Sequence, residues 1–182
     1  MNLYLSVNLT TQHLEQPALA ESVLALLDKY QLPTVALRFE ITESALMRDQ
    51  QSAIRTMQAL SDAGIKLALD DFGTGYSSLK YLKELPLDAI KIDRSFVQDI
   101  GIDHNDETII DAMLGMAGSL GMYCVAEGVE TEQQLAFFNK RGCYLIQGFL
   151  FSKPLPAAEL LALLQSEQFA PTSNRDNDNW QL

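Results

Sequence analysis

The sequence has no apolar run long enough to cross a bilayer, and no basic segment of the kind that opens a signal peptide. It has only two cysteines, Cys124 and Cys143, in or beside predicted strands. Such a pair is typical of buried thiols in a reducing compartment rather than of a disulfide or a metal site. We therefore expect a cytoplasmic chain, which a parent protein could anchor to a membrane through a region outside this sequence.

Basic residues are also scarce. The chain has 13 Lys and Arg against 24 Asp and Glu, and its formal net charge is −11. This charge argues against a broad basic surface for a nucleic acid polymer. A small phosphorylated ligand remains compatible with it, provided that metal ions neutralise the site. With 182 residues, of which 47% are hydrophobic, the chain can form one globular domain with a real core.

Strand-like and helix-like segments alternate along the chain. The predicted strands are 3–9, 37–42, 65–71, 89–93, 123–127 and 144–148. The predicted helices are 17–30, 52–64, 77–83, 106–120, 131–142 and 156–166, with Thr131 and Gln134 as a capping box. Six β/α units of roughly thirty residues predict parallel strands joined by crossover helices.

A polar residue lies at or near the carboxyl end of every predicted strand. These residues are Asn8, Glu40, Asp70 with Asp71, Lys91, Glu127 and Gln147. A barrel places its reactive groups at that end of all its strands, whereas an open doubly wound sheet gathers them near one switch point. The pattern predicts an α/β fold, an incomplete (β/α) TIM-type barrel.

About six of the eight β/α units of such a barrel are present, because a complete one takes about 250 residues. The chain opens directly on a strand, so we expect the deficit to be N-terminal, in a fragment or a truncated gene product. Residues 1–167 would form the domain, and the polar residues 168–182 a disordered tail.

The segment 67–78, LALDDFGTGYSS, places two adjacent carboxylates after a hydrophobic run and before a loop hinged by Gly73 and Gly75. Carboxylates and an Asn without histidine suit Mg²⁺ or Mn²⁺ better than Zn²⁺. His13 and His104 are expected to be bystanders. Each acid taken alone could equally be a helix cap, a turn residue or an ion-pair partner. Six polar strand ends together favour shared ligands.

Two ions in such a site can activate water and stabilise a leaving oxygen in phosphodiester hydrolysis. Lys91 lies between Ile90 and Ile92 in a short predicted strand. Neighbouring carboxylates would raise its pKa, which favours orientation of water and electrostatic stabilisation over base catalysis.

The motifs of residues 3–164 resemble, in order and spacing, the EAL domain of bacterial cyclic di-GMP phosphodiesterases. They are SVNLT, FEITES, LALDDFGTGYSSLKYL, IKIDRSF, VAEGVET and QGFLFSKPL. The resemblance implies hydrolysis of cyclic di-GMP to linear pGpG by two divalent cations, Mg²⁺ or Mn²⁺. It also implies a homodimer when the barrel is complete, and upstream sensor or cyclase domains in a parent protein.

The resemblance also implies a role for each matching residue. The metals would be held by Asn8, Glu40, Asp70, Asp71 and Glu127. The catalytic group would be Lys91, which handles the nucleophilic water, with Glu127 and Asp71. Glu43 would hold the flexible loop of Phe72, Gly73, Thr74, Gly75, Tyr76, Ser77 and Ser78. Glu130 and Gln147 would complete the polar shell.

One part of the family pattern is missing. The Glu-Ala-Leu motif, which supplies a metal ligand and is followed by an arginine that helps hold substrate, does not occur in this sequence. The alternatives are therefore a cyclic di-GMP receptor without turnover and a protein-interaction module. A metal-dependent lyase or enolising barrel, suggested by the fold alone, is disfavoured by the motifs.

Overall fold

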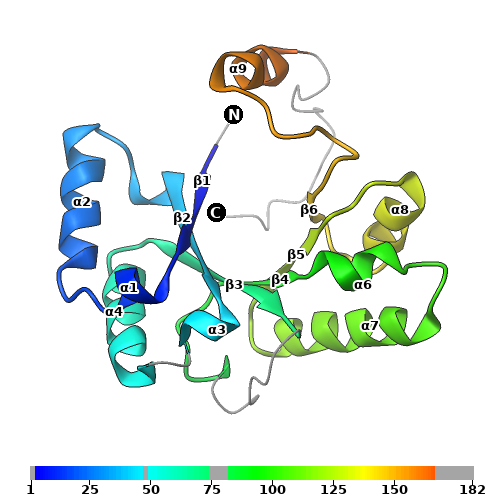
Figure 1. The fold of residues 1–182 in the computed structure, drawn as a ribbon, viewed down its shortest axis with the longest axis horizontal. Coiled ribbons are helices and arrows are strands. Elements are labelled where there is room, and N and C mark those ends of the chain that lie inside the picture. Colours follow the sequence, from blue (N-terminus) through cyan, green and yellow to red (C-terminus); the bar gives the residue numbers. More distant parts are fainter. Residues whose placement is uncertain (1–2, 47–48, 74–81, 167–182) are drawn as a thin grey trace.

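A computed structural model describes residues 3–46, 49–73 and 82–166 (Figure 1). Their strands form one parallel sheet in chain order. The strands are β1 (Leu5–Leu9), β2 (Leu37–Thr42), β3 (Lys66–Phe72), β4 (Ala89–Ile92), β5 (Tyr123–Glu127) and β6 (Leu145–Gln147). Sequential parallel order is that of a (β/α) barrel. The predicted incomplete TIM-type barrel is confirmed.

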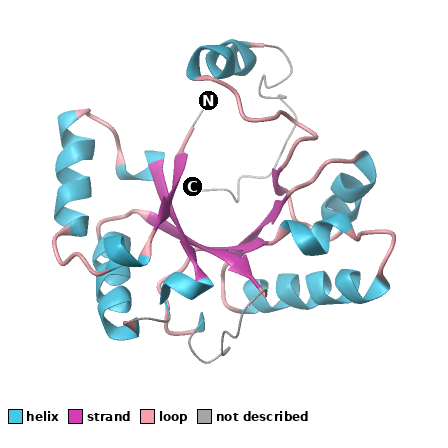
Figure 2. Ribbon diagram, viewed as in Figure 1, coloured by secondary structure: helices cyan, strands magenta, loops and turns pink. Residues whose placement is uncertain are grey.

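Helices connect the strands and cover one face of the sheet. They are α1 (Thr11–Leu14), α2 (Leu19–Lys29), η1 (Thr34–Ala36), α3 (Glu43–Leu46), α4 (Gln50–Asp62), α6 (Arg94–Gln98), α7 (His104–Ser119), α8 (Glu132–Lys140) and α9 (Ala157–Gln165). Figure 2 shows the sheet as an arc that ends at β1 and β6, with α9 beyond its open side. In the described part of the chain no helix has the length and apolarity needed to span a bilayer.

The hydrophobic core lies between the convex face of the sheet and the helices. Ile41 on β2, Met57 on α4, Ile90 on β4 and Ile110 on α7 are completely buried there. Because successive side chains of a strand point to opposite faces of the sheet, every second side chain lies on the concave face. That concave face is the one on which Glu40 and Lys91 meet. The barrel interior is thus polar, while the stabilising apolar contacts lie outside it.

The two cysteines belong to this core. Cys124 and Cys143 are free thiols and both are buried. Burial raises the pKa of Cys124 to about 12 and that of Cys143 to about 11, so neither is a thiolate at neutral pH. The predicted burial of both cysteines is confirmed.

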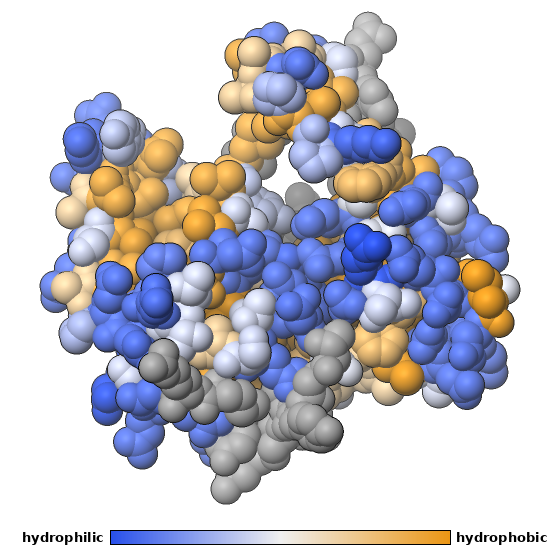
Figure 3. Space-filling view, in the orientation of Figure 1, coloured by the Kyte–Doolittle hydropathy of each residue, from blue (hydrophilic) through white to orange (hydrophobic). Residues whose placement is uncertain are grey.

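Apolar residues are exposed where the arc is open. On β1, Leu5 is 64% exposed, and on α9, Leu161 is 57% exposed. In the space-filling view hydrophilic residues cover the middle of the face seen in Figure 1, while apolar residues gather near α2 and around α9 (Figure 3). Neither edge strand has a second neighbour among the described residues, so each has one unpaired side.

Side-chain caps mark the start of α4, α6, α7 and α8. Asp49 accepts a hydrogen bond from Ser52 N at 3.1 Å, so α4 begins at Gln50, two residues before the predicted start. The predicted capping box of Thr131 and Gln134 is confirmed at the start of α8. The helix predicted from Pro17 begins instead at Leu19.

Three short helices, α1, α3 and α6, were not predicted, because four or five residues are too few to show a helical period. Asp93, predicted as the end of a strand, instead caps α6 and accepts from Ser95 N at 2.9 Å. His13 lies in α1 and its ring accepts from Thr10 N at 3.2 Å, a local capping role. The helix predicted at 77–83 falls largely outside the described residues.

A close backbone approach locks the end of β6 to the segment after β5. A Cβ added to Gly148 would lie 2.0 Å from Val129 O and 2.4 Å from Val129 N. The same carbonyl accepts from Leu150 N at 3.0 Å, so the backbone cannot retreat without losing this bond. Only glycine fits here.

We therefore expect Gly148→Ala to lower the free energy of unfolding by about 3 kcal/mol, the upper range for overpacking. The matched control is Gly115→Ala in α7, where an added Cβ meets no atom within 4 Å. The control should raise the free energy of unfolding by about 0.5–1 kcal/mol through helix propensity. Urea unfolding followed by circular dichroism measures both; similar values for the two variants would contradict the close approach.

Candidate metal centre

The Lys91 ammonium is the centre of the polar site. Its Nζ lies 2.6 Å from Glu127 Oε1 on β5 and 3.3 Å from Asp70 Oδ1 on β3, and it donates to Glu40 Oε2 on β2. The Lys91 side chain is only 4% exposed. Four neighbouring strands thus each contribute one charged group, as predicted from their polar carboxyl ends. Three carboxylates surround one cation, so the cluster keeps an excess of negative charge.

A bulge in β3 positions the two adjacent aspartates. Leu69 pairs with Ile90 and Phe72 with Ile92, so three steps along β3 match two along β4. Asp71 lies in the bulge and has a φ of 55°. This is a left-handed conformation, which aspartate tolerates better than most residues. Asp71 N also donates to Asp70 Oδ1 at 3.0 Å. Without the bulge, strict alternation would send neighbouring side chains to opposite faces.

The electrostatics are those of crowded carboxylates. Burial raises the pKa of Glu127, and its hydrogen bond with Lys91 offsets only part of that rise. Burial, Asp70 and Asp93 together raise the pKa of Asp71. For Lys91, burial works to lower the pKa, but hydrogen bonds with Glu127 and Glu40 outweigh it and the pKa rises well above its ordinary value. The ammonium therefore stays protonated, which disfavours base catalysis as predicted.

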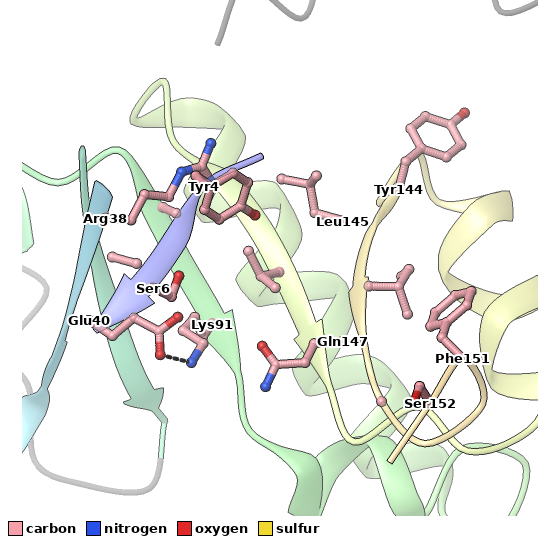
Figure 4. Close-up of a pocket in the computed structure, with 15 residues that line it drawn as sticks. Tyr4, Ser6, Arg38, Glu40, Lys91, Tyr144, Leu145, Gln147, Phe151 and Ser152 are labelled. Carbon is pink, nitrogen blue, oxygen red and sulfur yellow. Dashed lines mark hydrogen bonds and ion pairs between the residues drawn. The ribbon is translucent and has the colours of Figure 1, made fainter. Parts of the chain in front are cut away.

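The concave face holds a cleft of about 610 Å³, and the cluster forms one part of its wall. Figure 4 shows Glu40 joined to Lys91, with the Gln147 amide across the cleft from them. Ser6, Ala68 and Ala89 line the same cleft with small side chains. Space therefore remains beside the charged groups for a ligand.

Most of the other predicted site residues lie on the two edge strands, at the end of β3 and in the segments that follow β3 and β5. Asn8 pairs in register with Glu40 but is exposed on the edge strand. Gln147 is exposed on the other edge strand. Glu130 is exposed beyond β5, and its backbone N donates to Gln134. Phe72, predicted to lie in the flexible loop, is instead the last residue of β3 and is buried. Gly73 ends the described part of that loop; Thr74, Gly75, Tyr76, Ser77 and Ser78 lie outside the described residues.

Glu43 begins α3 and is 5% exposed, and neither carboxylate oxygen has a hydrogen-bond partner among the described residues. A buried carboxylate without a partner is costly and calls for a donor or a cation. This requirement suits the predicted loop-holding role, which stays a prediction.

Two residues near the site were missed by the sequence reasoning. Asp93 lies two positions after Lys91, just past the end of β4, and its charge acts on Asp71. Gln134 is buried and donates to Val97 O at 3.0 Å while accepting from Glu130 N and Thr131 N. It fixes the segment after β5. Only its capping role could be predicted, because Val97 lies 37 residues away in sequence.

The donor set fits a hard divalent cation. All the carboxylates can bind a metal through oxygen. Three carboxylates also carry more negative charge than one lysine can neutralise. In the described residues no group of three acidic, histidine or cysteine side chains is arranged around a common metal position. Lys91 Nζ lies among three of the carboxylates that an ion would use. A metal would therefore compete with Lys91 for them.

Fold and site together define a (β/α)-barrel protein with an acidic centre at the carboxyl ends of its strands. The family model described as the EAL domain matches residues 1–154. The chain belongs to the EAL domain family.

Similar proteins and solved structures agree with this assignment. The chain is 45% identical to the cyclic di-GMP phosphodiesterase NbdA of Pseudomonas aeruginosa over 92% of its own length and 21% of that protein. The structure of PaMucR phosphodiesterase with c-di-GMP is 41% identical, with a TM-score of 0.80 over 86% of this chain and 64% of that one. Klebsiella pneumoniae BlrP1, in a manganese and cy-diGMP complex, is 34% identical, with a TM-score of 0.78 over 84% and 39%.

The chain thus spans about a fifth of the curated relative NbdA and about two thirds of the PaMucR chain.

Proposed function

We propose that this chain carries most of the active site of a phosphodiesterase that hydrolyses cyclic di-GMP to linear pGpG. The observation that carries the proposal is the convergence of Glu40, Asp70 and Glu127 on Lys91 from four adjacent strands. Two similar structures support the choice of substrate, because they hold c-di-GMP. The proposed cofactors are two divalent cations, Mg²⁺ or Mn²⁺.

The residues that would hold these cations are Asn8, Glu40, Asp70, Asp71 and Glu127. Bound there, divalent cations would supply positive charge that offsets the phosphate charge and lowers the pKa of the attacking water. The Lys91 ammonium, kept protonated by Glu127 and Glu40, donates hydrogen bonds and so orients that water and stabilises negative charge on the phosphate oxygens. The water oxygen would bond to phosphorus while one P–O3′ bond breaks, and the proton lost by the water would end on the ribose O3′, so the ring opens to linear pGpG.

Glu43 would position the loop of residues 72–78, and Gln147 would contact the phosphate side of the ligand from the far wall of the cleft. A homodimer in the completed barrel, and sensor or cyclase domains in a longer protein, stay predictions.

The test is pGpG release from cyclic di-GMP, measured by chromatography at matched Mg²⁺ or Mn²⁺ concentration. We expect this chain alone to be at least about a hundredfold slower than a version extended upstream to include the family's Glu-Ala-Leu segment, because that segment supplies a metal ligand. Asp70→Asn should abolish the activity of the extended version.

Comparable rates for the short and extended versions would mean that the six strands suffice for the chemistry. Saturable binding of cyclic di-GMP by the extended version without pGpG release would instead favour a receptor, and no binding at all would favour an interaction module.

A further inference from the structure

A buried arginine lies at the other end of the cleft. Arg38 precedes Glu40 by two residues on β2, so it projects from the same face about 6.6 Å nearer the amino end of the strand. Its guanidinium carbon lies 3.6 Å from the centre of the Tyr4 ring and 5.4 Å from that of Tyr123. Figure 4 shows the guanidinium beside Tyr4, pointing away from the Glu40–Lys91 pair.

This guanidinium has no counter-ion in the part of the chain that the structure describes. Arg38 is only 6% exposed, its Nε has no hydrogen-bond partner, and no carboxylate pairs with it among those residues. The nearby Glu40 carboxylate is already bound by Lys91. A buried charge left without a partner is strongly unfavourable, and stacking on aromatic rings compensates only part of the cost.

Arg141 is a second stacked arginine in this protein and serves as a comparison for Arg38. Arg141 also stacks on an aromatic ring, at 3.4 Å from the centre of Phe137. It is nevertheless paired with Asp111, with Nη2 at 3.2 Å from Oδ2. The two stacked arginines thus differ in two respects: Arg38 is more deeply buried, and it has no anion among the described residues, whereas Arg141 has one.

The cleft leaves room for that anion. Arg38 and Tyr4 line the cleft of about 610 Å³ together with the small side chains of Ser6 and Ala68. Lys91, which also lines it, is surrounded by three carboxylates. An incoming anion would therefore be repelled at the Lys91 end and attracted at the Arg38 end.

We propose that Arg38, flanked by Tyr4 and Tyr123, forms a binding site for a small oxyanion, a carboxylate or phosphate group, at the amino end of the barrel interior. The guanidinium supplies paired N–H donors that match two oxygens of one such group. The Ser6 hydroxyl, on the neighbouring strand in register with Arg38, offers a further donor. The site lies in the same cleft as the proposed catalytic centre but at its opposite end, and it does not depend on the proposed activity.

The test follows the side-chain Nε–Hε resonances of Arg38 and Arg141 by NMR in the ¹⁵N-labelled chain. Sodium acetate and inorganic phosphate are the two probes, and sodium chloride at equal ionic strength is the control. Arg38→Lys identifies the Arg38 signal and keeps the charge while removing the fork. Arg141 is the internal reference, since Asp111 already occupies its donors.

We expect a saturable shift of the Arg38 signal, half complete at about 1–50 mM, a range that suits two charge-assisted hydrogen bonds. Arg141 should not follow it, and chloride should not reproduce it. A thermal shift in acetate or phosphate should appear in the parent chain and vanish in Arg38→Met. Tighter binding of acetate would indicate a carboxylate site, and tighter binding of phosphate would indicate a phosphate site.

Shifts of equal size at Arg38 and Arg141, or shifts that grow linearly and equally with chloride, would overturn the site. A thermal shift that survives in Arg38→Met would overturn it as well, because the anion would then bind elsewhere.

Discussion

Replacement of Lys91 by methionine should lower the free energy of unfolding by about 3–5 kcal/mol in metal-free buffer, the cost of breaking a buried ion-pair cluster. Methionine keeps most of the aliphatic length of the lysine, so packing changes little. What is lost is the cation that now lies among Glu40, Asp70 and Glu127. Those carboxylates would remain buried close together without a counter-charge.

Lys66→Met is the matched control, because it also removes a lysine from an ion pair. Lys66 Nζ lies 2.7 Å from Asp88 Oδ1, but the Lys66 side chain is 42% exposed. A pair so open to water contributes about 1 kcal/mol or less. Urea unfolding with a chelator present measures both variants.

The same experiment repeated with Mn²⁺ separates a metal centre from a purely structural cluster. A cation that binds the folded state restores stability in proportion to its affinity. Lys91→Met should therefore recover more stability with Mn²⁺ than the parent chain gains, because the ion no longer competes with the ammonium. A loss as small as that of Lys66→Met, or no recovery with metal, would show that the carboxylates do not act as a unit.

Much of the fold follows from local patterns in the sequence. Strands such as β1, LSVNL, alternate apolar and polar residues, and caps such as Thr131 with Gln134 mark where a helix begins. Parallel order and a polar residue at each carboxyl end together predicted the convergence of Glu40, Asp70 and Lys91 on one face. That part of the site could be predicted because strand period and strand direction fix it.

Other features depend on contacts between residues distant in sequence. The β3 bulge that directs both Asp70 and Asp71 is a mismatch of register with β4, which no single strand reveals. The isolation of Arg38 is likewise invisible in the sequence, because any of 24 acidic residues could have been its partner. Short helices such as α6 arise from one capping residue, Asp93, and leave no periodic pattern.

Mn²⁺ should bind this chain, and Asp70→Asn should weaken that binding at least about tenfold. Asp70 lies at the bulge, where its Oδ1 also accepts from Asp71 N, a bond that the asparagine oxygen can keep. The substitution therefore removes a negative charge and one oxygen ligand while it preserves the local backbone. A hard cation depends on that charge more than on any other property of the ligand.

Asp88→Asn is the control. Asp88 lies just before the amino end of β4, the end opposite the cluster, and accepts from Lys66 Nζ and from Leu67 N at 3.0 Å. It loses the same charge as Asp70→Asn but at a position outside the proposed metal centre. The affinity of this variant for Mn²⁺ should stay within about twofold of the parent, because Asp88 is already paired with Lys66 and lies at the opposite end of the strands from the cluster.

The measurement is a titration of Mn²⁺ followed by electron paramagnetic resonance, in which the signal of free Mn²⁺ falls as the ion binds. The proposed centre predicts saturable binding by the parent chain and by Asp88→Asn, and a clear loss in Asp70→Asn. Equal affinity in all three proteins, or no binding by any of them, would contradict a metal centre at the carboxyl ends of these strands.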